Sequence, residues 1–141
     1  MIVVDASVAA MWFLPEPMSD AAARLLDADH ELAAPDLLRL EVASALLKAV
    51  RRGAVAPADA AEALARLSVS PLRFEPAGIY AEPAFSLAQR HGGSVYDGTY
   101  IALAQALGAV VATNDAELAR TARAAGVTVW HLSERPPDGL G

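Results

Sequence analysis

The sequence predicts an α/β fold in which helices cover both faces of a mainly parallel sheet. Two short apolar runs, Met1–Val4 and Ala109–Thr113, have the pattern of buried strands, and an acidic residue closely follows each of them. Helical periodicity fills most of the chain between the two runs. Because strands that alternate with helices form parallel sheets, both acidic residues are expected at the edge where the strands end.

The first part of the chain is expected to contain three helices and one further strand. Ser19 is a good N-cap for the second helix, and Asp36, which follows Pro35, can cap the third helix before it stops at Gly53. The third helix carries Glu41. The expected bounds are about 7–15, 19–28 and 36–52 for the helices and 31–34 for the strand.

The second part of the chain alternates helical and extended patterns in the same way. Ser94 is expected to begin the longest of its helices and Gly108 to end it. The expected bounds are about 57–67, 79–91, 94–107 and 116–125 for the helices, with extended segments at 72–75, 109–113 and 127–131.

Length and composition predict a single domain over residues 1–141, because 55% of the residues are apolar and no repeat or linker interrupts the chain. The tail 135–141 holds two prolines and two glycines and should be loose. The N-terminal apolar run contains Asp5 and has no basic leader, so neither a signal peptide nor a membrane span is expected. The cytoplasm is therefore the default location.

The absence of cysteine and the net charge limit the kinds of site and of function that this chain can have. The absence of cysteine excludes disulfides, thiolate metal sites and cysteine nucleophiles. The formal net charge of -6 argues against a broad basic surface for nucleic acid, because Lys and Arg supply most non-specific affinity for phosphates. A nuclease is still compatible with this charge, since an acidic site can meet phosphates through the divalent cations that it recruits.

Two candidate acidic residues lie in the first part of the chain. Asp5 could be a helix N-cap, but Ser7 is available for that role. Glu41 has apolar and small neighbours on its helix face and no basic partner at the usual spacing. A carboxylate in such surroundings indicates a role other than that of a solvated surface charge.

Two more candidates lie in the second part. Asp97 follows Ser94 with the spacing of a capping box, which is a structural alternative for it. Asp115 could stabilise a helix dipole, although Asn114 and Glu117 already form a capping-box pattern that leaves Asp115 unassigned. Four acids at strand ends and helix starts, without cysteine or a nearby histidine, describe an all-oxygen site that suits Mg²⁺ or Mn²⁺ rather than Zn²⁺.

Four short segments carry a family resemblance. They are Ile2–Ser7, the helix with Glu41 that follows Ala34-Pro35, Ser94–Asp97 leading into Tyr100–Ala104, and Ala112–Asp115. In this order and spacing they make the chain similar to a PIN domain of the VapC toxin family along nearly its whole length. One departure is Gly98, where relatives more often have alanine or a similar helix former. This glycine should cost the helix about 1 kcal/mol without removing a ligand.

The resemblance implies a Mg²⁺- or Mn²⁺-dependent endoribonuclease, the toxin of a toxin-antitoxin pair. The implied catalytic and metal-binding residues are Asp5, Glu41, Asp97 and Asp115. Thr113 and Ser7 would belong to the surrounding polar shell. The ion would lower the pKa of a bound water and orient it for in-line attack, so no protein nucleophile is needed. The resemblance further implies single-stranded or loop RNA as substrate, a 5′-phosphate product, a VapB-type antitoxin as partner, and a homodimer.

Three other classes share parts of this pattern. A receiver domain needs a lysine at a late strand, whereas the only lysine, Lys48, lies in the helix of Glu41. A dehalogenase-type phosphatase needs a second acid two residues after the first, and that position is Ser7. A non-catalytic binding module with the same fold is the main alternative, although such a module would be expected to lose part of the acidic quartet.

Two further groups of residues have open roles. The end of the helix with Glu41 is basic, with Lys48, Arg51 and Arg52. These residues could serve only to stabilise the helix dipole, or they could contact the RNA backbone. Trp12–Leu14, in the first predicted helix, are candidates for the core or for a subunit interface.

Overall fold

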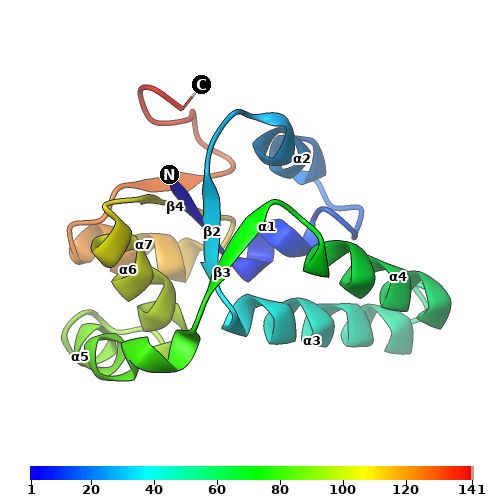
Figure 1. The fold of residues 1–141 in the computed structure, drawn as a ribbon, viewed down its shortest axis with the longest axis horizontal. Helices are drawn as coiled ribbons and strands as arrows, with labels where there is room; N and C mark the ends of the chain where they lie inside the picture. Colours follow the sequence, from blue (N-terminus) through cyan, green and yellow to red (C-terminus); the bar gives the residue numbers. More distant parts are fainter. Residues whose placement is uncertain (141) are drawn as a thin grey trace.

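The computed structural model describes residues 1–140 and contains one five-stranded sheet in the order β3-β2-β1-β4-β5, shown in Figure 1. Every neighbouring pair of strands is parallel, so the predicted α/β class is confirmed. The strands are β1 (Ile2–Val4), β2 (Leu32–Pro35), β3 (Leu72–Glu75), β4 (Val110–Thr113) and β5 (Val129–His131).

Helices cover both faces of this sheet, as predicted. Their bounds are α1 (Ala6–Ala10), α2 (Ser19–Asp27), α3 (Leu37–Arg51), α4 (Pro57–Ser68), the short 3₁₀ helix η1 (Ala77–Tyr80), α5 (Ala81–His91), α6 (Val95–Leu107) and α7 (Ala116–Ala124). Helices α1 to α4 pack together on one side of the sheet, and α5 to α7 pack on the other (Figure 1). Helix α6 lies directly against β1, β2 and β4.

The strand order places a topological switch point between β1 and β4. From β1 the chain moves outward to β2 and β3, and then it returns across the sheet to β4 and β5. Sites in open parallel sheets form outside the carboxyl ends of the strands at such a point. Asp5 directly follows β1, and only Asn114 separates Asp115 from the end of β4, so the fold brings the two predicted acids to this crevice.

The structure corrects the predicted N-cap contacts of two helices and the predicted end of another, while the starts of the two helices lie within one residue of the prediction. Beyond Ala10 the hydrogen bonds tighten to i→i+3 turns, so α1 ends well before Pro15. Ser19 does not cap α2, because its hydroxyl accepts the Glu16 N–H instead. Asp36 does not cap α3 through its side chain, because its carboxylate accepts the N–H of Ala77 at the start of η1.

Gly98 lies where α6 packs against α5, and this gives the glycine a packing role in addition to its expected cost in helix stability. A Cβ atom at this position would lie 2.5 Å from the carbonyl oxygen of Ala84. Two helices can approach so closely only where one of them has no side chain. Glycine at 98 therefore sets the distance between the two helices, one residue after Asp97.

Trp12–Leu14 follow α1 and pack inward. Leu14 is buried, and the indole of Trp12 donates a hydrogen bond of 2.8 Å to the carbonyl of Ala22. In the predicted loose tail, Leu140 packs against the core, and Gly141 lies outside the described residues. No helix among residues 1–140 is long and apolar enough to cross a membrane.

Candidate active site

The four predicted acids gather around the switch point. Asp5 follows β1, Asp115 follows β4, Glu41 lies in the second turn of α3, and Asp97 lies in the first turn of α6. They are close enough for their charges to act on one another. Burial is the largest cause of the raised pKa of Glu41 and of Asp97. The charges of Asp5 and Asp97 raise the pKa of Glu41 further, and those of Asp115 and Asp5 raise the pKa of Asp97 further. The fold thus concentrates negative charge in one place.

Asp5 is the most deeply buried of the four, with 6% of its surface exposed. Its Oδ2 accepts hydrogen bonds from the hydroxyls of Ser7, at 2.7 Å, and Thr113, at 2.8 Å. Burial raises the pKa of Asp5; the two hydroxyl bonds oppose this shift, and the charge of Asp115 adds to it. The predicted polar shell of Ser7 and Thr113 therefore directly holds the first carboxylate.

The same two hydroxyls tie the end of β1 to the end of β4. Ser7 Oγ accepts the N–H of Asn114 at 2.9 Å, and Thr113 Oγ1 accepts the N–H of Asp115 at 2.9 Å. Each hydroxyl donates to Asp5 and accepts from the chain after β4. This arrangement fixes Asp5 relative to Asp115. Ser7 lies inside α1 and does not cap it; Asp5 occupies the N-cap position, but its side chain forms no capping hydrogen bond.

Glu41 is held by a residue that the sequence analysis assigned no role. The hydroxyl of Tyr100, in α6, donates a hydrogen bond of 2.8 Å to Glu41 Oε1. Burial raises the pKa of Glu41, and this hydrogen bond opposes the shift. Burial and the nearby acids raise the pKa of Tyr100 well above its usual value, so the phenol stays a donor. The only signal in the sequence was a tyrosine three residues after Asp97.

The two remaining acids, Asp115 and Asp97, both lie at helix starts, but only Asp115 caps its helix with its side chain. Asp115 is the N-cap of α7, and its Oδ1 accepts the N–H groups of Glu117 at 2.8 Å and Leu118 at 3.2 Å. The predicted cap by Asn114 is therefore wrong. Ser94 caps α6 by accepting the N–H of Asp97 at 3.0 Å, which engages the main chain of Asp97. The Asp97 side chain lies toward the other acids, and burial is the largest cause of its raised pKa.

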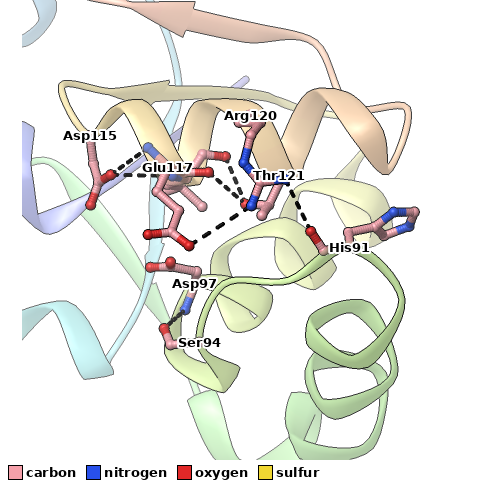
Figure 2. A network of polar contacts seen from close by, with 8 residues as sticks. His91, Ser94, Asp97, Asp115, Glu117, Arg120 and Thr121 are labelled. Carbon is pink, nitrogen blue, oxygen red and sulfur yellow. Dashed lines mark hydrogen bonds and ion pairs between the residues drawn. The ribbon is translucent and has the colours of Figure 1, made fainter.

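A fifth acid, Glu117, and Arg120 lie near Asp97 and Asp115, as Figure 2 shows. The charge of Glu117 also raises the pKa of Asp97. Arg120 Nη2 lies 3.8 Å from Glu117 Oε1, and its Nη1 donates to the carbonyl of His91 at 3.2 Å (Figure 2). Arg120 thereby brings a positive charge beside the acids. No local pattern in the sequence predicts this contact, because His91 and Arg120 lie 29 positions apart in the chain.

The ligand atoms that this site offers are of the kind that a hard divalent cation prefers. The four acids offer only oxygen ligands, which Mg²⁺ and Mn²⁺ prefer. Within residues 1–140, none of them forms an ion pair with Lys or Arg, and three have a pKa raised by burial. In the same part of the chain, however, no three acidic or histidine side chains converge into a ready ligand group. A bound ion would therefore have to draw the carboxylates together.

The predicted basic residues lie away from the acids. Lys48, Arg51 and Arg52 are exposed at the carboxyl end of α3. Glu41 lies near the other end of this helix, and ten residues separate it from Arg51, which corresponds to roughly 15 Å along the axis. The structure does not bring these three residues to the acidic group.

Comparison with known proteins places the chain among PIN domains. The sequence model of the PIN domain matches residues 2–124. Ribonuclease VapC3 of Pyrobaculum aerophilum is 38% identical over 84% of this chain and 92% of that protein, and Ribonuclease VapC9 of Mycobacterium tuberculosis is 37% identical over 88% and 93%.

Solved structures agree with these matches. The crystal structure of PAE2754 from Pyrobaculum aerophilum has a TM-score of 0.70 and 27% identity, and the match covers 91% of this chain and 89% of that one. Mycobacterium tuberculosis VapC20, described as a sarcin-ricin loop cleaving toxin, has a TM-score of 0.72 over 96% of this chain and 100% of its own. At 22% identity, this second likeness shows the fold alone.

Proposed function

We propose that this chain, which belongs to the PIN-domain family and has VapC ribonucleases as its relatives, hydrolyses RNA phosphodiester bonds with a divalent cation. The metal-binding and catalytic residues of this proposal are Asp5, Glu41, Asp97 and Asp115. One observation carries it: four carboxylates from four separate elements lie around the switch point, near enough for their charges to act on one another, and none has an ion pair to Lys or Arg within residues 1–140. Such a concentration of like charge is unfavourable unless a cation relieves it.

Mg²⁺ or Mn²⁺, when bound, would activate a water for in-line attack and offset charge at the phosphorus. The chain itself supplies the orientation of the ligands. Ser7 and Thr113 fix the Asp5 carboxylate, and the phenol of Tyr100 fixes Glu41. The Asp115 carboxylate is held on Oδ1 by two N–H groups of α7, while Oδ2 forms no hydrogen bond within the described chain.

RNA as the substrate is supported by the relatives, which are named as ribonucleases. Arg120 supports it physically, because its guanidinium lies at the rim of the acidic group and could meet a phosphate there. Lys48, Arg51 and Arg52 stay proposed contacts for a longer RNA, at the far end of α3. Single-stranded or loop RNA is the expected form, since its bases and backbone are accessible.

The toxin role is also part of the proposal, with a VapB-type antitoxin as partner. An apolar groove of about 270 Å³ between α3 and α4 supports it, and its wall includes Leu47, Val50 and Leu64. A small protein could cover this groove and place a basic side chain over the acids. We further propose a homodimer in the cytoplasm. Expression alone should arrest growth, and co-expression of the adjacent small protein should relieve the arrest.

The decisive experiment is cleavage of a labelled RNA by the purified protein. Cleavage should require Mg²⁺ or Mn²⁺, stop in EDTA and return when the metal is restored. Asp97→Asn is the matched variant, because it keeps the shape of the side chain and removes its charge. Full activity of the parent in EDTA would exclude the metal mechanism. RNA binding without cleavage, in both proteins, would favour the non-catalytic binding module instead.

A further inference from the structure

A cavity of about 280 Å³ lies between α1 and α3, on the Glu41 side of the acidic group. We refer to it as the α1–α3 cavity. Its apolar wall includes Ala10, Met11, Leu14 and Ala45. Sites for small ligands usually combine such an apolar wall with a few polar groups, and their volumes begin at roughly 300 Å³. A flat aromatic ring system of modest size is therefore a suitable occupant.

The α1–α3 cavity is continuous with the acidic group. Glu41 forms part of its lining, and so does Ser7, whose hydroxyl donates to Asp5 at 2.7 Å. A molecule in the cavity would thus lie next to two of the proposed metal-binding carboxylates. This position suits a part of the substrate that flanks the cleaved bond.

Asn114 adds a polar group to the lining. Its main-chain N–H is held by Ser7 Oγ at 2.9 Å, which fixes the residue at the cavity. Its side-chain amide does not cap α7, because Asp115 does so, and within residues 1–140 the amide forms no hydrogen bond. An amide carries both donors and an acceptor, which is the combination that reads the edge of a nucleobase.

We propose that the α1–α3 cavity is a nucleobase subsite, which takes the base of a nucleotide next to the cleaved phosphodiester. The apolar wall covers the face of the base, and Asn114 hydrogen-bonds to its edge. The inference rests on the proposed ribonuclease function, and it assigns to this site a preference for one base. Ala45 controls access to the cavity, because it is partly exposed and a larger side chain there would project into the cavity.

Two variants and two controls test the subsite. Asn114→Ala removes the amide, and Ala45→Leu fills the cavity. Gln105→Ala is the control for the first, because Gln105 carries an exposed amide that bonds to Ala125. Ala58→Leu, at an exposed position of α4, is the control for the second.

The first measurement is the distribution of cut sites on an RNA of randomised sequence, with Mg²⁺. The parent should prefer one base at a position beside the cut. Asn114→Ala should reduce this preference about tenfold, as expected from the loss of a bidentate base contact. Ala45→Leu should raise KM about tenfold, and both controls should behave like the parent. The subsite is wrong if both variants keep the parent's distribution and KM.

The second measurement needs no catalysis. Binding of adenosine, guanosine, cytidine and uridine to the metal-free protein is followed by saturation-transfer NMR. One nucleoside should bind in preference, and Ala45→Leu should abolish its signal. Such binding in a protein that cleaves no RNA would overturn the proposed ribonuclease function alone. RNA cleavage without base preference or nucleoside binding would overturn the subsite alone. If Ala45→Leu instead prevents only the binding of the antitoxin, the cavity is a binding site for a protein and the inference fails.

Discussion

The hydroxyl of Tyr100 and the carboxylate of Glu41 are joined by a hydrogen bond of 2.8 Å, which links α6 to α3. Tyr100 is buried, with 1% of its surface exposed, so its ring cannot turn away from Glu41 without unpacking the core. The bond therefore fixes one acid of the group through a neighbouring helix.

Tyr100→Phe should lower kcat about tenfold, which corresponds to about 1.4 kcal/mol. The ring and its packing are kept, whereas Glu41 loses the donor that orients it. Steady-state cleavage at several Mg²⁺ concentrations measures the effect, and the variant should require more Mg²⁺ for half-maximal activity. An unchanged kcat and an unchanged Mg²⁺ requirement would show that the bond has no part in catalysis.

Asp97→Asn should abolish cleavage and yet raise the melting temperature of the metal-free protein, by about 2–4 °C for each kcal/mol of relieved repulsion. The reason is that Asp5 and Asp115 act on the charge of Asp97, which the amide lacks. Saturating Mg²⁺ should stabilise the parent more than the variant, because binding to the folded state adds stability. Thermal melts in EDTA and in Mg²⁺ provide the comparison. A variant that melts well below the parent in EDTA would mark Asp97 as a structural residue.

The stability of the metal-free protein should depend on pH in a direction set by three acids. Asp5, Glu41 and Asp97 have a pKa raised above the ordinary values of 3.8 for Asp and 4.5 for Glu. The folded protein therefore favours the protonated form of each acid. The stabilising effect of this form is fully present below the ordinary pKa, and it is lost as the pH rises through the raised pKa of the folded state. Urea midpoints from about pH 4 to pH 8, in EDTA, should fall more steeply for the parent than for Asp97→Asn. Parallel curves for the two proteins would contradict the repulsion between Asp97 and the other acids.

Gly98→Ala should destabilise the protein, although alanine favours helices. The added Cβ would lie 2.5 Å from Ala84 O, and overpacking of this kind costs about 1–3 kcal/mol, which exceeds the gain in helix propensity of about 1 kcal/mol. Gly78→Ala is the control, because a Cβ there meets nothing within 4 Å. Urea unfolding should separate the two variants, and cleavage by Gly98→Ala should also fall, since α6 carries Asp97. Equal stability of both variants would exclude the steric explanation.

Arg120→Ala should raise KM for RNA with little change in kcat, and it should weaken the dependence of KM on salt. Arg120 lies beside the acidic group, whereas Arg123, on the same helix, is paired with Glu134 at 2.6 Å. Arg123→Ala is therefore the matched control and should bind RNA as the parent does. Equal effects of the two substitutions would indicate that only the overall charge of α7 matters.

The sequence predicted the two central strands, the bounds of α6 and the acidic edge. The apolar runs of β1 and β4 and the two cap residues of α6, Ser94 and Gly108, need only local information. The same strands fix where Asp5 and Asp115 lie, because the carboxyl ends of parallel strands share one edge.

Side-chain partners could not be predicted in the same way. Asp36 accepts the N–H of Ala77, and Tyr100 donates to Glu41; neither pair is local in the chain. The space available at Gly98 is set by Ala84 on another helix. Such contacts depend on how helices pack, which a single sequence does not show.

The position of β1 in the middle of the sheet has a consequence for the synthesis of this protein. Strand β1 is made before its partner β4, and 108 positions in the chain separate Asp5 from Thr113. Until β4 is made, Asp5 lacks the Thr113 hydroxyl and its acidic neighbours across the sheet. The acidic group is therefore complete only after β4 has been made and has paired with β1.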